Sequence, residues 1–231
     1  MRAPSRLLLK LSGEVFQGEN GAFSPSRLHR ISVELAALPV ETAIVVGGGN
    51  ILRGAKSPWL DRVDADTLGM LATILNALAL RATLEREGRK AIVQSAVMTE
   101  LTEPVSPWKA RRLLAHGSVV IFAGGTGNPL VTTDTAAAVR AVSIHADLLA
   151  KGSTVAGVFT QDPKKSGAAR RLDAVSFDDY LSHRYGVMDL VAVELCREHN
   201  LPILVYDFND ESALPAIASG RQVGTLIGPA D

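Results

Sequence analysis

Short apolar runs alternate with longer helical stretches along the whole chain, and this alternation constrains the fold more than any other feature. Six runs have the near-continuous apolar character of strands buried on both faces: 6–11, 42–46, 91–94, 119–123, 147–150 and 203–206. We therefore expect an α/β fold, a three-layer αβα sandwich around a mainly parallel open sheet. With 231 residues, 47% of them hydrophobic, the chain is predicted to form a single domain over 1–231.

Three helical segments stand out between these runs. The first begins at Ser24, a cap followed by proline. The second runs from Asp66 to about Glu87 and is apolar almost all the way round, so it is buried in the core or against another subunit, and we favour a subunit interface for part of it. The third, 187–199, is predicted to stop at Asn200 in a left-handed conformation.

Composition excludes several classes of protein. Lysine plus arginine number 24, as do aspartate plus glutamate, so no net charge attracts nucleic acid or an anionic membrane. The single cysteine, Cys196, excludes an internal disulfide and fits a reducing, cytoplasmic location, and its apolar neighbours favour a buried structural thiol. The longest apolar stretch, 70–84, contains Thr73, Asn76 and Arg81, so we expect no membrane span.

Lys10 lies at the end of the first apolar run, where an unpaired charge would be costly. Either the side chain leaves the strand end for water, or it meets an anion. We favour an anion, because Ser12 and Gly13 follow at once and form a turn whose amides can face a phosphate.

Two glycine-rich turns follow other strands. Gly47-Gly48-Gly49 precedes Arg53, and we expect these glycines to serve the close approach of a ligand rather than packing. Gly124 to Gly127 is followed by Thr132-Thr133-Asp134, which opens an alanine-rich helix and makes an anion site at its positive end. Capping by the threonines and ligand binding are both compatible with this pattern. For Asp66, the cap of a helix and a contact to ribose hydroxyls stay equally open.

Two common nucleotide-binding patterns are missing from the sequence. It has no G-x-x-x-x-G-K-[ST] loop, and no G-x-G-x-x-G opens a helix after the first strand, which disfavours a P-loop enzyme and a dinucleotide oxidoreductase. The five histidines are not closely paired, so they are expected on the solvated surface.

In order along the chain, the motifs resemble those of the bacterial uridylate kinases of the amino-acid kinase superfamily. The resemblance covers nearly the whole chain and rests on Lys10-Leu11-Ser12-Gly13-Glu14, 47–54, 66–73, Gly125-Thr126-Gly127-Asn128-Pro129, Thr132-Thr133-Asp134, Val187-Met188-Asp189, Leu195-Cys196-Arg197 and Leu201-Pro202-Ile203.

This resemblance implies transfer of the γ-phosphoryl group of Mg-ATP to UMP, in a homohexamer activated by GTP and inhibited by UTP. Lys10 and Asp134 would be the catalytic pair, and Mg²⁺ would be held mainly by the ATP phosphates, with no protein metal site. The ATP site would comprise Lys10, Leu11, Ser12, Gly13, Gly49, Arg53, Ser153, Phe159 and Asp162. The UMP site would comprise Gly48, Asp66, Thr126, Gly127, Asn128, Pro129, Leu130, Val131, Thr132 and Thr133. The GTP-response segment would be Gly18, Glu19, Asn20, Gly21, Ala22 and Phe23.

The sequence departs from the family at two places. In the family pattern K-A-T-K-V-D-G-V-[YF], this chain has Thr154 and Ala156 in place of the second lysine and the aspartate, and Leu130 and Val131 replace two phenylalanines. Two other functions therefore stay open: a protein of this fold that binds a nucleotide or oxyanion without transferring phosphate, and a superfamily kinase for another small phosphate or carboxylate.

Overall fold

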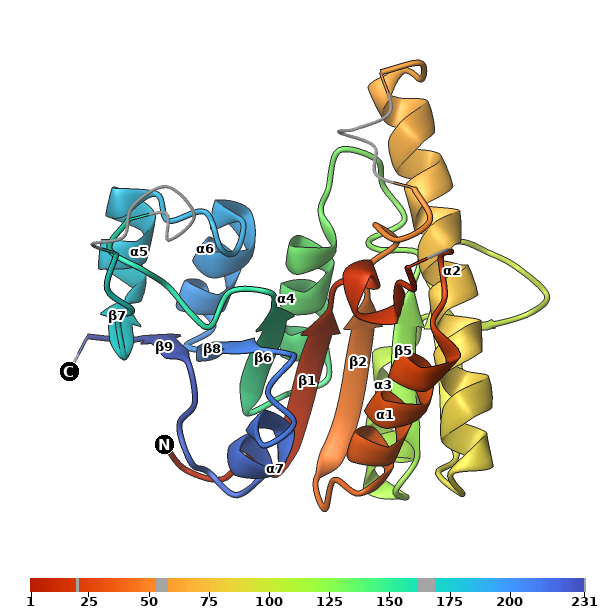
Figure 1. Ribbon diagram of the computed structural model, residues 1–231, viewed down its shortest axis with the longest axis horizontal. Helices are drawn as coiled ribbons and strands as arrows, with labels where there is room; N and C mark the ends of the chain where they lie inside the picture. Colours follow the sequence, from red (N-terminus) through yellow and green to blue (C-terminus); the bar gives the residue numbers. More distant parts are fainter. Residues whose placement is uncertain (20, 53–57, 162–168, 231) are drawn as a thin grey trace.

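The computed structural model describes residues 1–19, 21–52, 58–161 and 169–230. Within these, the strands form one sheet in the order β4-β3-β5-β2-β1-β6-β8-β9-β7 (Figure 1). The strands are β1 (Arg6–Leu11), β2 (Glu41–Val46), β3 (Ala91–Ser95), β4 (Glu103–Pro104), β5 (Val119–Ala123), β6 (Leu148–Ser153), β7 (Ala174–Ser176), β8 (Ile203–Asp207) and β9 (Thr225–Gly228). Every neighbouring pair is parallel except β8 and β9, which confirms the predicted fold class.

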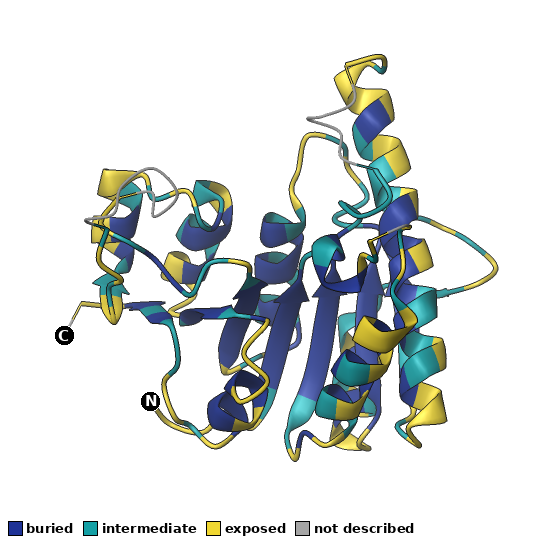
Figure 2. Cartoon of the chain, viewed as in Figure 1, coloured by how far each residue is buried: buried dark blue, intermediate teal, exposed yellow. Residues whose placement is uncertain are grey.

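Helices cover both faces of this sheet. They are η1 (Gly13–Phe16), α1 (Pro25–Ala36), α2 (Arg62–Arg86), α3 (Pro107–Ala115), α4 (Thr133–Ser143), α5 (Phe177–His183), α6 (Leu190–Glu198) and α7 (Ala213–Ala218). Two hydrophobic cores result: one joins the sheet to α1, α2 and α7, and the other joins it to α3, α4, α5 and α6. Figure 2 shows the central strands buried except at their ends, and the solvent-facing sides of the helices exposed.

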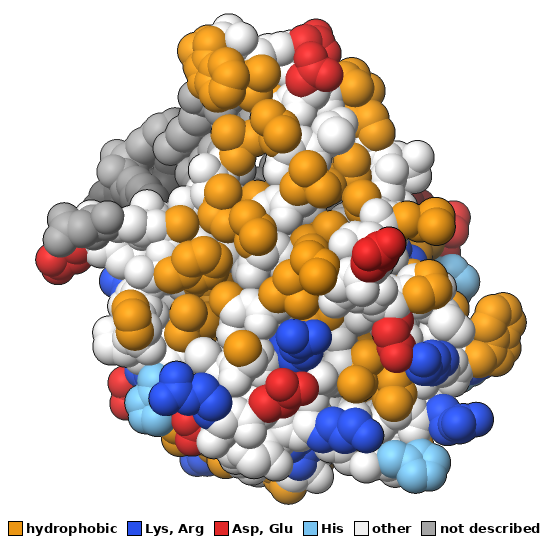
Figure 3. All heavy atoms as spheres, turned by 90° about the vertical axis from the view of Figure 1, so that its right-hand side faces the viewer, with side chains coloured by type: hydrophobic (Ala, Val, Ile, Leu, Met, Phe, Trp, Pro, Cys, Tyr) orange, Lys and Arg blue, Asp and Glu red, His pale blue; other side chains and the backbone are white. Residues whose placement is uncertain are grey.

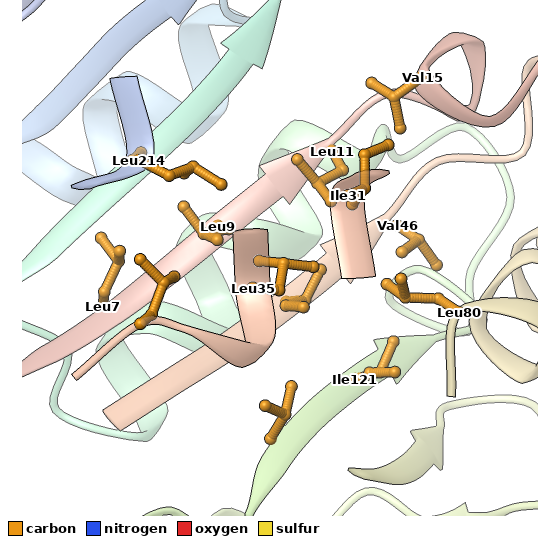
Figure 4. Close-up of a cluster of buried hydrophobic side chains, with 14 of the residues drawn as sticks. Leu7, Leu9, Leu11, Val15, Ile31, Leu35, Val46, Leu80, Ile121 and Leu214 are labelled. Atoms are coloured by element: carbon orange, nitrogen blue, oxygen red, sulfur yellow. The ribbon is translucent and has the colours of Figure 1, made fainter. Parts of the chain in front are cut away.

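The alternation of side chains along β1 decides where its lysine lies. Leu7, Leu9 and Leu11 belong to the core beneath α1, α2 and α7 (Figure 4), whereas Leu8 belongs to the opposite core. Because successive side chains of a strand point to opposite faces, Lys10 shares the face of Leu8, which α4 covers. The strand therefore delivers its charge to the first turn of α4.

The termini of the predicted helices follow from local capping. Ser24 caps α1 through a bond from the Arg27 amide, as expected. For α2 the predicted start at Asp66 was wrong, because Asp61 is the cap and the helix begins one turn earlier, at Arg62. The third predicted helix, α6, begins at Leu190, and Asn200 has φ 50° at its end, which confirms the left-handed stop.

Helix α2 is long and apolar enough to cross a bilayer by length and composition alone, which the sequence expectation of no membrane span did not anticipate. In this fold it packs against α1, β3 and β5. Two of its polar side chains, Thr73 and Asn76, are buried. A core helix of this kind meets the same criterion as a membrane-spanning one.

The order of the strands creates one topological switch point. Strand β1 pairs with β2 on one side and with β6 on the other, and all three are parallel. The loops after β1, β2, β5 and β6 therefore leave the same edge of the sheet, and ligands of open α/β sheets bind at such a point. Both predicted glycine turns and the turn after Lys10 lie at this edge.

Candidate active site

Two buried lysines share one aspartate at the switch point. Lys10 and Lys151 are direct partners across the β1–β6 pair. The Lys10 ammonium lies 2.9 Å from Asp134 Oδ1, and the Lys151 ammonium lies 2.5 Å from Asp134 Oδ2. Asp134 is in the first turn of α4, so the helix places one carboxylate over two adjacent strand ends. The structure thus brings together the predicted pair Lys10 and Asp134.

Charge in this cluster does not cancel, since two ammonium groups face a single carboxylate. Burial raises the pKa of Asp134, but Lys10 and Lys151 outweigh this effect and lower it from 3.8 to about 2. The resulting stabilisation, about 2 kcal/mol, is complete above pH ~4 and is lost as the pH falls through the folded pKa. Within this trio the two lysines exceed the carboxylate by one positive charge, and the nearby Asp189 carboxylate also acts on Lys151.

The Lys151 side chain was not among the predicted site residues. It ends the apolar run 148–150 as Lys10 ends its own, and this repeated pattern was the signal that could have found it. Its ammonium also donates to the Val187 carbonyl at 2.5 Å, which fixes the segment before α6. Burial and the charge of Lys10 lower the pKa of Lys151, against the opposing effects of Asp134 and Asp189.

Asp189, the cap of α6, ties this segment to the start of α4. Its carboxylate accepts from the Thr135 hydroxyl at 3.1 Å and from the Thr132 hydroxyl. Thr132 in turn caps α4, since its oxygen accepts from the amides of Asp134 and Thr135 at 3.2 Å. The capping role proposed for Thr132 is therefore confirmed, whereas its contact to UMP stays a prediction.

The turns after β1 and β2 are in contact. A Cβ on Gly13 would lie 2.4 Å from Asn50 Oδ1 and 2.7 Å from the Gly49 amide, so no side chain fits there. A Cβ on Gly48 would lie 2.7 Å from the Gly69 carbonyl on α2. For Gly48, the expectation that the glycines after β2 serve no packing purpose was wrong, because α2 crosses directly over the turn.

A buried pair of amides holds the turn after β2. The Asn76 amide nitrogen donates to the Gly47 carbonyl and to Asn50 Oδ1, both at 2.7 Å. The Asn50 amide nitrogen returns a bond to Asn76 Oδ1 at 3.0 Å and donates to the Ala22 carbonyl at 2.7 Å. Asn76 is fully buried, so these bonds satisfy a side chain that would otherwise destabilise the core.

The loop after β5 carries the predicted acceptor residues. Gly124, Gly125 and Gly127 have φ of 73°, 57° and 84°, the left-handed region that glycine enters without strain. The loop is tied down at one end by the Gly124 amide, which donates to Thr73 Oγ1 at 2.7 Å. Exposed Leu130 also has a positive φ, 66°, which costs energy in a residue with a side chain and is frequent at ligand-binding loops.

Asp66 joins this loop to α2. Its Oδ2 atom accepts from the Leu130 amide at 3.0 Å and from Arg62 at 2.9 Å. Its Oδ1 atom has no partner within the described parts of the chain. Asp66 is therefore not the cap of α2, which is Asp61. The Oδ1 atom of Asp66, beside the loop after β5, is left for a ligand hydroxyl.

On the other side of β1, a cavity of about 620 Å³ borders Ser153 and Phe159. Its remaining walls are Val155, Thr160, Gln161 and 183–187. The predicted ATP residues Ser153 and Phe159 therefore line one hollow, next to Lys151. Thr154, which replaces the family's second lysine, is exposed to solvent.

Thr225 of β9 holds the segment in which the family's aspartate is missing. Its buried hydroxyl accepts from the Val158 amide at 2.9 Å and donates to the Leu172 carbonyl at 2.5 Å. A Cβ on Gly157 would lie 2.4 Å from this hydroxyl oxygen, and Gly157 has φ 145°. The loop is thus fixed without a contribution from Ala156.

Several predicted site residues fall outside the described residues, namely Arg53, Asp162 and Asn20. The rest of the predicted GTP-response segment forms a tight turn after η1, in which the Gly18 amide donates to the Gly21 carbonyl at 3.0 Å. Among the described residues there is no group of three or more His, Cys, Asp and Glu side chains that could hold a metal ion. All five histidines are exposed, as expected.

A larger hollow, of about 820 Å³, lies at the opposite edge of the sheet beside the N-terminal segment and the ends of α4 and α6. We place the active site at the carboxyl edge instead, because the shared aspartate and the three glycine-containing turns meet there.

The comparisons with known proteins agree with this geometry. The model of the Amino acid kinase family matches residues 5–207. The chain belongs to this family. It is 46% identical to the uridylate kinase of Ectopseudomonas mendocina over 229 residues, 96% of this chain and 93% of the relative. It is 45% identical to the uridylate kinase of Alcanivorax borkumensis over 230 residues, 96% of this chain and 91% of the relative.

Solved structures of this family share the whole architecture. A UMP kinase from Bacillus anthracis has a TM-score of 0.95 at 36% identity, with 100% of this chain and 98% of the other covered. A UMP kinase from Ureaplasma parvum has a TM-score of 0.91 at 31% identity, with 99% and 100% covered. The resemblance inferred from the motifs is therefore confirmed, both for the family and for the fold of this amino acid kinase.

Proposed function

We propose that this chain transfers the γ-phosphoryl group of Mg-ATP to UMP, producing UDP and ADP. The observation that carries the proposal is the cluster of Lys10, Lys151 and Asp134 at the switch point, where the two ammonium groups exceed the carboxylate by one charge. Phosphoryl transfer needs positioning and stabilisation of charge rather than a protein nucleophile, and this cluster can supply both. Kinship with proteins named uridylate kinase supports UMP as the acceptor.

In this proposal, UMP and ATP bind on opposite sides of β1. UMP lies between the turn after β2 and the loop after β5, where Asp66 Oδ1 can accept from ribose hydroxyls. ATP lies over the loop after β6, in the cavity beside Ser153 and Phe159. Lys10 and Lys151 then flank the phosphoryl group between the substrates, and Asp134 orients both ammonium groups.

Mg²⁺ enters as part of Mg-ATP and shields the charge of the phosphates. Both oxygens of Asp134 are occupied by ammonium groups, so this carboxylate fits poorly as a protein ligand of the metal. Lys10 and Lys151 therefore act on phosphate oxygens, and Asp134 acts through the two lysines rather than through the metal.

We also propose that the protein is a homo-oligomer, a hexamer by its resemblance to the family. Val63, Leu68, Leu71 and Leu75 of α2 are each 41–53% exposed. Figure 3 faces this side of the molecule and shows hydrophobic side chains over its upper part, with charged ones gathered below. An apolar helix face of this kind suits a second copy of the chain. A cytoplasmic location, activation by GTP through 18–23 and inhibition by UTP complete the proposal.

A coupled assay with ATP, Mg²⁺ and each nucleoside monophosphate tests the reaction. We expect UMP to be the best acceptor and turnover to stop when EDTA removes Mg²⁺. Tight ATP binding without ADP formation would instead support a nucleotide-binding protein, and faster turnover of another phosphate or carboxylate would identify a different superfamily kinase.

A further inference from the structure

Arg140, in the last turn of α4, is a half-buried cation with no carboxylate partner among the described residues. Its guanidinium carbon lies 5.9 Å from the centroid of the Phe122 ring, and its Nε atom is buried without a hydrogen-bond partner. No ion pair to it occurs within the described residues, and burial lowers its pKa. Because an unpaired charge inside a fold is costly, its presence needs a reason beyond packing.

Within the described residues, this guanidinium makes a single hydrogen bond, to the loop after β5. Arg140 Nη2 donates to the Gly125 carbonyl at 3.2 Å. Gly125 has φ 57°, and no peptide bond of the described chain is cis. In a trans peptide the N–H points away from the preceding carbonyl, so Arg140 turns the Thr126 amide to the side opposite itself.

Most amides of the loop after β5 donate hydrogen bonds within the protein, and two do not. The amides of Gly124, Gly127, Asn128 and Leu130 all donate within the protein. Those of Gly125 and Thr126 have no acceptor in the described part of the structure. Two adjacent amide donors, those of Gly125 and Thr126, therefore remain free on this loop. Arg140 holds the loop from the side opposite the Thr126 amide.

We propose that Arg140 is a positioning residue of the acceptor site, which orients the Gly125–Thr126 peptide so that the Thr126 amide, with the free Gly125 amide beside it, binds an oxygen of the acceptor nucleotide. The oxygen is a base carbonyl or a phosphate oxygen. The guanidinium also adds positive potential behind the peptide and strengthens the Thr126 amide as a donor. This inference rests on the proposed function, because it takes the loop after β5 as the acceptor site.

Arg140→Met keeps the length of the side chain and removes its charge and its hydrogen bond. We expect the KM for UMP to rise about tenfold, with the KM for ATP and kcat changing less than about twofold. Arg140→Lys retains the charge and should recover part of the affinity for UMP. The melting temperature should not fall in Arg140→Met, because an apolar side chain replaces an unpaired buried charge.

Arg197→Met is the matched control, since Arg197 occupies the last turn of the neighbouring helix α6, where it is exposed and ion-paired. It should leave both KM values unchanged. An unchanged KM for UMP in Arg140→Met would overturn the proposal. So would an equal rise of both KM values with a lower melting temperature, which would indicate a purely structural role.

Competition by uridine and by ribose 5-phosphate identifies the oxygen that the amides bind. If the bound oxygen is a base carbonyl, Arg140→Met should weaken inhibition by uridine. If it is a phosphate oxygen, the variant should weaken inhibition by ribose 5-phosphate. The proposal is contradicted if inhibition by neither compound is weakened. Wild-type protein that fails to phosphorylate UMP would refute the proposed function separately, and the same comparison is then made with the acceptor it does use.

Discussion

Two lysines at strand ends, Lys10 and Lys151, show how much a local sequence pattern can predict. The sequence predicted that Lys10 needs an anion, and the structure supplies Asp134 from 124 positions further along the chain. That partner follows from α4 covering β1, which a local pattern does not encode. Lys151 was not predicted although it also ends an apolar run, because its meeting with Lys10 and Asp134 depends on β6 pairing with β1, which no local pattern encodes.

Lys10→Ala is expected to lower kcat by at least an order of magnitude, because it removes charge stabilisation in the transition state. Asp134 keeps Lys151 as its partner, so the fold should persist, as circular dichroism can verify. The control is Lys109→Ala, which removes an exposed lysine paired with Glu103. A variant that turns over as fast as the wild type would refute the role of Lys10.

The lowered pKa of Lys151 predicts an early alkaline limb in the pH profile of kcat. Its ammonium should lose its proton below the ordinary value of 10.5, and the rate should fall with it. The free energy of unfolding should instead rise with pH over this range. The pKa of Lys151 is lower in the folded state than in the unfolded state, so its contribution to stability increases between the two pKa values.

Rates and urea midpoints measured from pH 7 to 11 check both trends. Lys151→Arg provides the comparison, since arginine stays charged over this range and should remove the limb. An alkaline limb in the wild type that begins only above 10.5 would contradict the assignment.

At the scale of elements, α2 shows what periodicity can and cannot predict. Its apolar pattern predicted a long helix correctly, but the pattern weakens in the first turn, where Asp61 and Arg62 follow a loop, and the start was misplaced. Its crossing over Gly48 could not be foreseen, because the contact depends on the packing angle of the helix. Asn76 looked like an interruption of the apolar run, yet it anchors a turn of the site.

Asn76→Leu should destabilise the protein by about 2 kcal/mol, because the Gly47 carbonyl and the Asn50 amide lose their buried partner. The same change should raise KM for at least one substrate, since the turn after β2 is no longer held. Urea denaturation and steady-state kinetics measure the two effects. Thr67→Val, an exposed position on the same helix, is the control and should stay within about 0.5 kcal/mol.

For the whole molecule, the six long strands and the αβα layering were predicted from sequence, whereas β4, β7 and β9 were not. β4 is the dipeptide Glu103–Pro104, and β7 and β9 are three and four residues long, too short for an alternating pattern to be recognised. These strands lie toward the two edges of the sheet, where less burial is required. The centre of the sheet, which positions the site, is the part that the sequence specifies best.

The exposed face of α2 predicts self-association. Replacing Leu71 and Leu75 together by aspartate should convert an oligomer into smaller species, because charged side chains would be buried in the contact. Analytical ultracentrifugation at micromolar concentration measures this. Val191→Asp, on exposed α6, should leave the wild-type state unchanged, and a wild-type monomer would count against the proposed interface.

The central place of β1 has a consequence for synthesis of the protein. β1 is synthesised long before its neighbour β6, which begins only at residue 148. Until then the growing chain carries an open hydrogen-bonding edge on a buried central strand, the kind of edge that recruits other chains. Only when β6 adds Lys151 beside Lys10 is this edge of β1 paired, so the closing of the edge and the meeting of the two ammonium groups occur in the same step.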